Sequence, residues 1–139
     1  MAEERVQRRL AAFLASDVVG YSRLMGEDEE GTLARLKTLR SEVFNPTTRK
    51  NGGRIVKTTG DGALVEFPSA VDAVRNALEI QRALADRSGG EPIRLRIGIN
   101  VGDVIVDGDD IYGDGVNVAA RIEGLASPGG ICISRTARD

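Results

Sequence analysis

The sequence lacks most of the residues on which nucleophile and transition-metal sites depend. Its 139 residues include no histidine, no tryptophan and a single cysteine, Cys132. Without histidine, a Ser-His-Asp triad and histidine-bound zinc are both excluded. One cysteine allows neither an internal disulfide nor a multi-cysteine metal site. Any catalytic chemistry must therefore use carboxylates, lysines, arginines, hydroxyl groups and the backbone.

Two further features are missing: a long apolar run and an excess of positive charge. No hydrophobic stretch approaches the length of a membrane span, and the charged N-terminus followed by a short apolar run is unlike a secretory signal. We therefore expect a cytoplasmic chain with no membrane segment. The net charge of −2 disfavours general nucleic-acid binding, although local positive charge can still hold a nucleotide phosphate.

Hydrophobic periodicity divides the chain into alternating strands and helices. Apolar residues at helical spacing lie between an acidic start and Pro46, and Asn51-Gly52-Gly53 ends that region. Ser69 with Asp72 predicts the capped start of a second helix. The segment Gly113–Ala126 is a third helical stretch. The expected strands are Leu10–Ser16, Arg54–Lys57, Ala63–Phe67, Ile93–Val101, its hairpin partner Val104–Val106, and Gly130–Ser134.

This order predicts an α+β fold within one domain, residues 1–139. The first six elements, β-α-β-β-α-β, match a ferredoxin-like antiparallel sheet with helices on one face, and a further β-α-β unit follows them. The other face of the sheet is left open for a partner or a ligand.

Two carboxylates stand at the ends of predicted strands. Asp61 lies with Lys57 around the turn between two strands, and Asp17 follows the first apolar run. Magnesium takes oxygen ligands and typically needs only one or two protein carboxylates plus phosphate oxygens. Each residue also has a plainer interpretation, because Asp61-Gly62 is a common hairpin turn and Asp17 could cap a helix. A shared metal site requires the first and third strands to be neighbours.

Two other segments are candidates for phosphate contacts. The backbone of the small-residue loop Val18, Val19, Gly20, Tyr21 and Ser22 could line a polyphosphate. Asn117 and Arg121 are four residues apart on one helix face, among apolar neighbours, and a guanidinium fork suits phosphate. A solvated polar stripe is the plainer interpretation of that pair.

Three blocks together resemble the catalytic domain of class III nucleotidyl cyclases. They are Asp17-Val-Val-Gly-Tyr-Ser22, Lys57-Thr-Thr-Gly-Asp61 and Asp110-Ile-Tyr-Gly-Asp-Gly-Val-Asn117-Val-Ala-Ala-Arg121, in the family's order. The resemblance implies two Mg²⁺ or Mn²⁺ ions on Asp17 and Asp61. It implies adenine selection by Lys57 and Asp110, and ribose and transition-state contacts from Asn117 and Arg121. The backbone of Val18–Ser22 would surround the triphosphate.

The resemblance also implies a homodimer that converts ATP to cyclic AMP and pyrophosphate. Asp17 and Asp61 would come from one protomer, and Lys57, Asp110, Asn117 and Arg121 from the other. Family domains usually continue into a further hairpin with a triphosphate-binding lysine, so we expect this chain to be a fragment without that lysine.

Three alternatives remain on the sequence alone. One is a cyclase-like module that binds nucleotide or dimerises without turnover. Another is a guanylyl cyclase, which the adenine-selecting Lys57 and Asp110 disfavour. The third is a diguanylate cyclase, which would carry a Gly-Gly-acidic-acidic-Phe turn where this chain has Thr59-Gly-Asp-Gly-Ala63.

Overall fold

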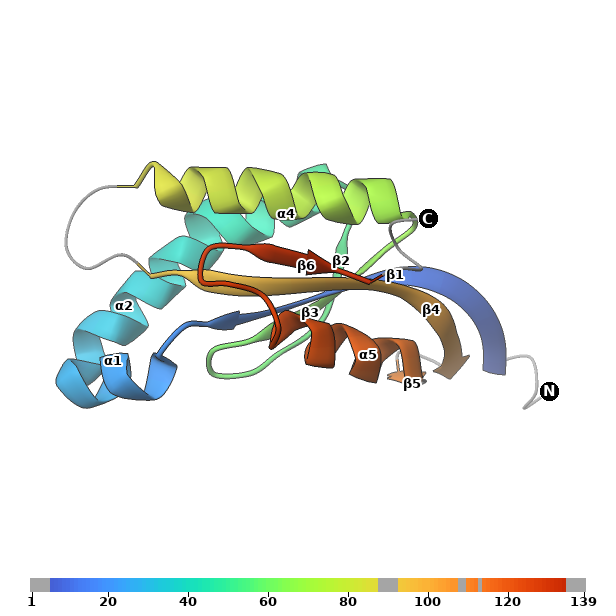
Figure 1. Ribbon diagram of the computed structural model, residues 1–139, viewed down its shortest axis with the longest axis horizontal. Helices are drawn as coiled ribbons and strands as arrows, with labels where there is room; N and C mark the ends of the chain where they lie inside the picture. Colours follow the sequence, from blue (N-terminus) through green and yellow to red (C-terminus); the bar gives the residue numbers. More distant parts are fainter. Residues whose placement is uncertain (1–5, 88–92, 108–109, 113, 135–139) are drawn as a thin grey trace.

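The computed structural model describes residues 6–87, 93–107, 110–112 and 114–134 (Figure 1). Of residues 6–9, 104, 106, 107, 110–112 and 114 it describes the backbone alone. The elements in chain order are β1 (Val6–Val18), α1 (Tyr21–Glu27), α2 (Glu29–Leu39), the π-helical turn η2 (Arg40–Phe44), α3 (Asn45–Lys50), β2 (Arg54–Thr58), β3 (Ala63–Phe67), α4 (Ala70–Ala85), β4 (Leu95–Asp107), β5 (Asp110–Tyr112), α5 (Asp114–Glu123) and β6 (Ile131–Ile133).

The strands form one sheet in the order β2-β3-β1-β4-β5. All neighbours along this path are antiparallel, and β6 lies parallel to β4. The order β2-β3-β1-β4 is that of the ferredoxin-like unit, so the predicted fold class is confirmed. The first and third predicted strands, β1 and β3, are direct neighbours, as a shared carboxylate site requires.

Helices cover both faces of the sheet. Figure 1 shows α4 on one side of the sheet and α5 on the other. The larger core lies under α2, η2 and α4, and includes the fully buried Phe67, Ile80 and Ile97. The smaller core lies under α5, where Phe13 and Ala119 are fully buried. The helix of the extra β-α-β unit therefore occupies part of the face that the sequence predicts to be open.

Two strands are longer than predicted. β1 runs to Val18 and so includes Asp17. β4 continues without a turn to Asp107, so the predicted return of Val104–Val106 as a hairpin partner is wrong. The cause is tertiary, because β1 pairs with β4 along thirteen residue pairs. Gly102 in the middle of β4 serves close packing, since a Cβ there would lie 2.9 Å from the Cα of Gly115 in α5.

The first helical region does not end at Pro46. After α2 the chain makes the π-helical turn η2, in which the N–H of Asn45 bonds to the carbonyl of Arg40, and then continues as α3 to Lys50. Pro46 lies in the first turn of α3, where a residue needs no backbone N–H for the helix. The helix therefore continues past Pro46, because proline is tolerated in that first turn, and the region ends at the predicted Asn51-Gly52-Gly53, with Asn51 as the C-cap of α3.

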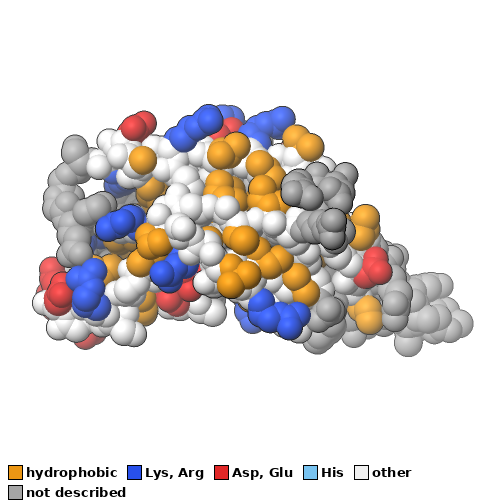
Figure 2. All heavy atoms as spheres, viewed as in Figure 1, with side chains coloured by type: hydrophobic (Ala, Val, Ile, Leu, Met, Phe, Trp, Pro, Cys, Tyr) orange, Lys and Arg blue, Asp and Glu red, His pale blue; other side chains and the backbone are white. Residues whose placement is uncertain are grey.

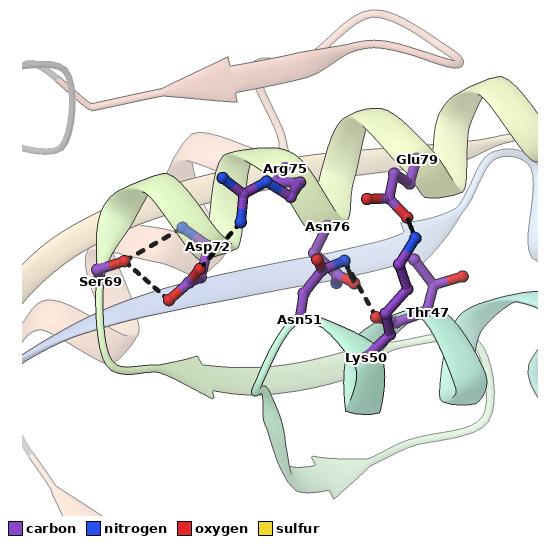
Figure 3. Close-up of polar contacts among 8 residues, drawn as sticks. All are labelled: Thr47, Lys50, Asn51, Ser69, Asp72, Arg75, Asn76 and Glu79. Carbon is purple, nitrogen blue, oxygen red and sulfur yellow. Dashed lines mark hydrogen bonds and ion pairs between the residues drawn. The ribbon is translucent and has the colours of Figure 1, made fainter.

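The predicted cap of the second helix is confirmed. Ser69 is the N-cap of α4, and its hydroxyl accepts a hydrogen bond from the N–H of Asp72 at 3.2 Å (Figure 3). The same hydroxyl donates to the Asp72 carboxylate at 3.0 Å, and Arg75 pairs with that carboxylate.

The start of the third predicted helix, Gly113, lies outside the described residues, and α5 ends at Glu123 rather than at Ala126.

Polar contacts join α3 to α4 inside the helical layer. The side chain of Asn51 donates to the Asn76 amide oxygen at 3.2 Å, and Asn76 donates to the hydroxyl of Thr48. At the surface, Lys50 pairs with Glu79 at 2.9 Å (Figure 3). These bonds satisfy buried amides and fix α3, the helix that follows η2.

No helix within the described part of the chain is both long and apolar enough to cross a membrane.

Candidate functional site

The pairing of β1 with β3 brings Asp17 and Asp61 to the same end of the sheet. Ser16 of β1 pairs with Ala63 of β3. The turn before Ala63, which contains Asp61, therefore lies beside Asp17, the residue after Ser16. Gly62 is needed for this approach, because a Cβ there would lie 3.0 Å from the carbonyl oxygen of Ser16. Asp17 lies within β1 and Gly20 is the N-cap of α1, so the helix-cap interpretation of Asp17 is wrong.

Asp61 lies in a tight turn that closes with two hydrogen bonds. The N–H of Thr59 donates to the carbonyl of Gly62 at 2.9 Å, and the N–H of Gly62 donates to the hydroxyl of Thr59 at 3.0 Å. A role of Asp61-Gly62 in the hairpin turn is therefore compatible with a role of the Asp61 carboxylate in metal binding. The turn determines the path of the backbone, and the backbone presents the carboxylate beside the end of β1.

A third acidic residue, Glu123, lies near these two carboxylates and was not among the predicted site residues. It is the last residue of α5, and its backbone packs directly over β4. A Cβ on Gly98 of β4 would lie 2.2 Å from the Glu123 nitrogen, so only glycine allows this approach. The sequence signal is helical spacing, because Glu123 lies four residues after the fully buried Ala119 and so faces the sheet.

The surroundings of Glu123 disfavour its charge. Burial, followed by the neighbouring Asp17 carboxyl group, raises the pKa of Glu123 to about 8, with Asp61 adding to the rise and Arg96 opposing it. Oδ1 of Asp17 and Oε1 of Glu123 are buried and receive no hydrogen bond while both groups are charged, whereas a protonated Glu123 can donate to Asp17, which is one cause of its raised pKa. Buried carboxylate oxygens without donors are costly unless a cation or water meets them.

These residues fit a hard divalent cation. Asp17 and Asp61 supply carboxylate oxygens, and one oxygen of Asp17 receives no hydrogen bond while Glu123 is charged. The described residues contain no cluster of three or more acidic, histidine or cysteine side chains with the geometry to enclose a metal. One or two carboxylates together with water and substrate phosphate oxygens are the ligands that Mg²⁺ typically takes.

We expect the metal-free protein to lose stability as pH rises from about 5 to 8, in part through Glu123. A raised carboxyl pKa means that the folded state holds the proton more tightly than the unfolded state, and this advantage disappears as pH passes the folded value. Glu123→Gln removes the effect. Its melting temperature relative to wild type, measured in EDTA, should increase steadily from pH 5 to pH 8. A difference independent of pH would contradict this assignment.

The other predicted site residues either have side chains at the surface or, in the case of Asp110, have no described side chain. Lys57 is exposed on β2, immediately after a bulge in its pairing with β3. Asn117 and Arg121 are exposed on α5. For Asp110 only the backbone is described, where it pairs with Asp107 at the start of β5. The described part of the chain thus brings Asp17 and Asp61 to one end of the sheet and exposes Lys57, Asn117 and Arg121 at the surface.

The loop after β1 is a narrow turn into α1. Val18 ends β1 and is buried, and the N–H of Val19 donates to the carbonyl of Arg94 at 2.9 Å. Gly20 has a φ of 66°, in the left-handed region that favours glycine. Tyr21 and Ser22 then begin α1. This geometry places the start of a short helix next to Asp17.

A separate apolar groove of about 670 Å³ runs along the outer side of α4. Its lining includes Val71, Leu78 and Ile133, which are 65%, 40% and 38% exposed. Figure 2 shows hydrophobic side chains gathered over α4 and β6, with Lys and Arg nearby. The groove contains none of the predicted site residues and is distinct from the carboxylate pair.

Several known proteins similar to this chain are named as cyclases. Residues 7–139 match the family "Adenylate and Guanylate cyclase catalytic domain". A protein from Rhizobium meliloti (strain 1021) named "Putative adenylate cyclase 3" is 53% identical over 138 residues, covering 96% of this chain and 24% of that protein. An adenylate cyclase from Streptomyces coelicolor is 37% identical over 125 residues, covering 89% of this chain and 32% of that protein. The chain thus spans a quarter to a third of these relatives.

Solved structures agree with the sequence comparison. The adenylate/guanylate cyclase/hydrolase from Silicibacter pomeroyi has a TM-score of 0.87 and 49% identity, and the match covers 96% of this chain and 80% of that one. The catalytic core of a rhodopsin-guanylyl cyclase with converted specificity, in complex with ATPαS, has a TM-score of 0.86 and 27% identity, covering 95% of this chain and 80% of that one. With the family match over nearly its whole length, the chain belongs to the adenylate and guanylate cyclase catalytic domain family.

Proposed function

We propose that this domain cyclises ATP to cyclic AMP and pyrophosphate, using divalent ions held by Asp17 and Asp61. The observation that carries the proposal is the pairing of β1 with β3, which brings both carboxylates to one end of the sheet, where a buried oxygen of Asp17 faces the carboxyl group of Glu123. Membership of the cyclase family supports the reaction class, and the names of the two relatives above support the adenylate activity.

The reaction joins the ribose 3′-oxygen to the α-phosphorus as the bond to pyrophosphate breaks. The 3′-hydroxyl gives up its proton, and negative charge grows on the α-phosphate oxygens. Bound Mg²⁺ or Mn²⁺ would lower the pKa of that hydroxyl and offset the charge. Arg121 would donate hydrogen bonds to the growing charge through its planar guanidinium, and Asn117 would orient the ribose. The backbone of Val18–Ser22 would follow the triphosphate.

Base selection is assigned to Lys57 and Asp110. A lysine ammonium can donate to N1 of adenine, and an aspartate can accept from its 6-amino group. Guanine carries a hydrogen at N1 and an oxygen at C6, so both contacts would be unfavourable. The chemistry of this pair therefore favours ATP over GTP.

The active site is proposed to form between two protomers. Lys57, Asn117 and Arg121 are exposed in this chain, whereas Asp17 and Asp61 lie at the end of the sheet. Exposed catalytic groups suit a site completed across an interface. One similar protein, a guanylyl cyclase domain from Blastocladiella emersonii, is described as a non-canonical dimer in one structure at 26% identity and as monomeric in another at 25% identity. Here the dimer would be a homodimer with two shared sites.

The proposal is tested by nucleotide turnover in the purified full-length protein. With Mn²⁺ and ATP we expect cyclic AMP and pyrophosphate in equal amounts, and with GTP a much lower rate. Cyclic GMP as the main product would reverse the base assignment and keep the reaction class. Binding of a non-hydrolysable ATP analogue by a folded dimer, without product under any metal condition, would favour a nucleotide-binding module and overturn the proposal.

A further inference from the structure

The turn that carries Asp61 is held from outside by an arginine of the helical layer. Arg40 begins η2, and the Nη2 group of its guanidinium donates to the carbonyl oxygens of Thr59 at 3.0 Å and Gly60 at 3.1 Å. These two carbonyls immediately precede Asp61 in the chain. Arg40 therefore connects a helix to the segment that presents a proposed metal ligand.

The backbone of Arg40 is firmly anchored. Its neighbours Leu39, Val43 and Phe44 are 4%, 7% and 3% exposed, so one side of the π-helical turn is anchored in the core, while Ser41 and Glu42 are exposed. The carbonyl of Arg40 accepts the hydrogen bond from Asn45 that defines this turn. Single π-helical turns within α-helical segments are rare and occur often at functional sites. The fixed backbone allows the guanidinium to act as a rigid support for the turn.

Other elements restrict the same turn from the remaining sides. A Cβ on Gly60 would lie 3.2 Å from the hydroxyl oxygen of Tyr21 in α1, and one on Gly62 would lie 3.0 Å from the carbonyl of Ser16. A hollow of only about 20 Å³ lies among Arg40, Asp61 and Gly62. The turn thus rests between α1, the end of β1 and η2, and Arg40 supplies its contact with the helical layer.

A guanidinium is well suited to this task. It stays charged at every relevant pH, and hydrogen bonds from a charged donor are stronger than neutral ones. Thr59 and Gly60 are exposed, so without Arg40 we expect their carbonyl groups to be hydrated and the turn to be less firmly held. Asp61 would then be displaced with them, and displacements of about 1 Å at a reacting centre are costly.

We propose that Arg40 is a positioning residue for metal binding. It holds the turn 59–62 so that Asp61 faces Asp17 at the separation a shared cation needs. The inference rests on the proposed function in taking Asp61 as a metal ligand. Arg40 is required for the affinity of the site for the ion, and it acts through the backbone of the turn without touching substrate.

The test is Mn²⁺ binding to the metal-free, nucleotide-free full-length protein, followed by the electron paramagnetic resonance signal of unbound Mn²⁺. Loss of two charge-assisted hydrogen bonds in Arg40→Met should weaken binding by about 10-fold or more. Arg40→Lys keeps a charged donor and should fall between Arg40→Met and wild type. Arg49→Met, an exposed arginine of α3, is the matched control and should bind like wild type.

The Mn²⁺ dependence of turnover provides a second measurement on the same variants. Weaker positioning should raise the Mn²⁺ concentration for half-maximal activity in Arg40→Met far more than it lowers the rate at saturating Mn²⁺. If Arg40→Met fails to fold, Arg40→Lys gives the same comparison with a smaller effect.

The outcomes separate the inference from the proposed function. A folded Arg40→Met protein with a lower melting temperature but unchanged Mn²⁺ affinity would show a purely structural role and overturn the inference alone. Equal Mn²⁺ binding by wild type and Asp61→Ala would remove Asp61 as a ligand, and would overturn both.

Discussion

Asp61→Ala is expected to abolish cyclic AMP formation while leaving the domain folded. Asp61 lies in a solvent-accessible turn whose shape depends on Thr59, Gly62 and Arg40, and those contacts do not involve the Asp61 side chain. Loss of a ligand to the catalytic ions removes several kcal/mol of transition-state stabilisation, which corresponds to a rate loss on the order of 10³-fold or more.

The measurement is the rate of cyclic AMP formation at saturating Mn²⁺ and ATP, with the melting temperature recorded for each variant. Asp86→Ala, at the C-cap of α4, is the control for removal of an exposed carboxylate and should keep full activity. Wild-type turnover in a folded Asp61→Ala protein would refute the metal assignment.

Arg121→Ala is expected to lower kcat by about 10²- to 10³-fold with little change in KM, because the proposed contact strengthens only as charge grows on the α-phosphate. Arg121 is exposed on α5, so the domain is expected to stay folded without it, and the melting temperature of the variant is recorded beside its kinetics. Arg121→Lys should restore little, since an ammonium cannot reproduce the two-pronged guanidinium contact.

The control for Arg121 is Arg82→Ala, an exposed arginine on α4 beside the apolar groove, which should leave kcat unchanged. A large rise in KM at constant kcat for Arg121→Ala would mean that the residue binds the ground state of the substrate. That result would contradict the role proposed for it.

The sequence predicts the strand order because local patterns agree with the final packing. The strand-turn-strand pattern around Asp61 and the cap at Ser69 are both present in the structure, since each depends on residues close in the chain. The extent of β1 and β4 could not be predicted in this way. Their length comes from pairing with each other, and the Gly102-Asp103 sequence that suggested a turn instead allows α5 to approach β4.

The candidate site was predictable only in part, for a related reason. Asp17 and Asp61 could be named from their positions at strand ends, and the β1–β3 pairing then brought them together. Glu123 and Arg40 act through contacts between distant segments. Glu123 approaches the carboxylates because Gly98 lets α5 pack closely, and Arg40 reaches a turn nineteen and twenty residues away. Neither residue has a neighbouring motif that marks it.

One consequence concerns how α5 would serve the dimer. Arg121 is exposed on this helix, and Glu123, two residues later, faces Asp17 of the same chain. If the proposed dimer forms, one helix would contribute Arg121 to the partner's site and Glu123 to its own. The hairpin of β2 and β3 would divide its residues in the same way, with Lys57 for one site and Asp61 for the other.

The shared site is tested most directly by mixing two inactive variants. Asp61→Ala loses the metal site of its own chain, and Arg121→Ala loses the group it gives to its partner. A heterodimer of the two keeps one intact site, so random mixing of equal amounts should recover about a quarter of wild-type cyclic AMP formation. Recovery at that level would support active sites built from two protomers. A mixture of folded, dimeric variants as inactive as each alone would contradict it.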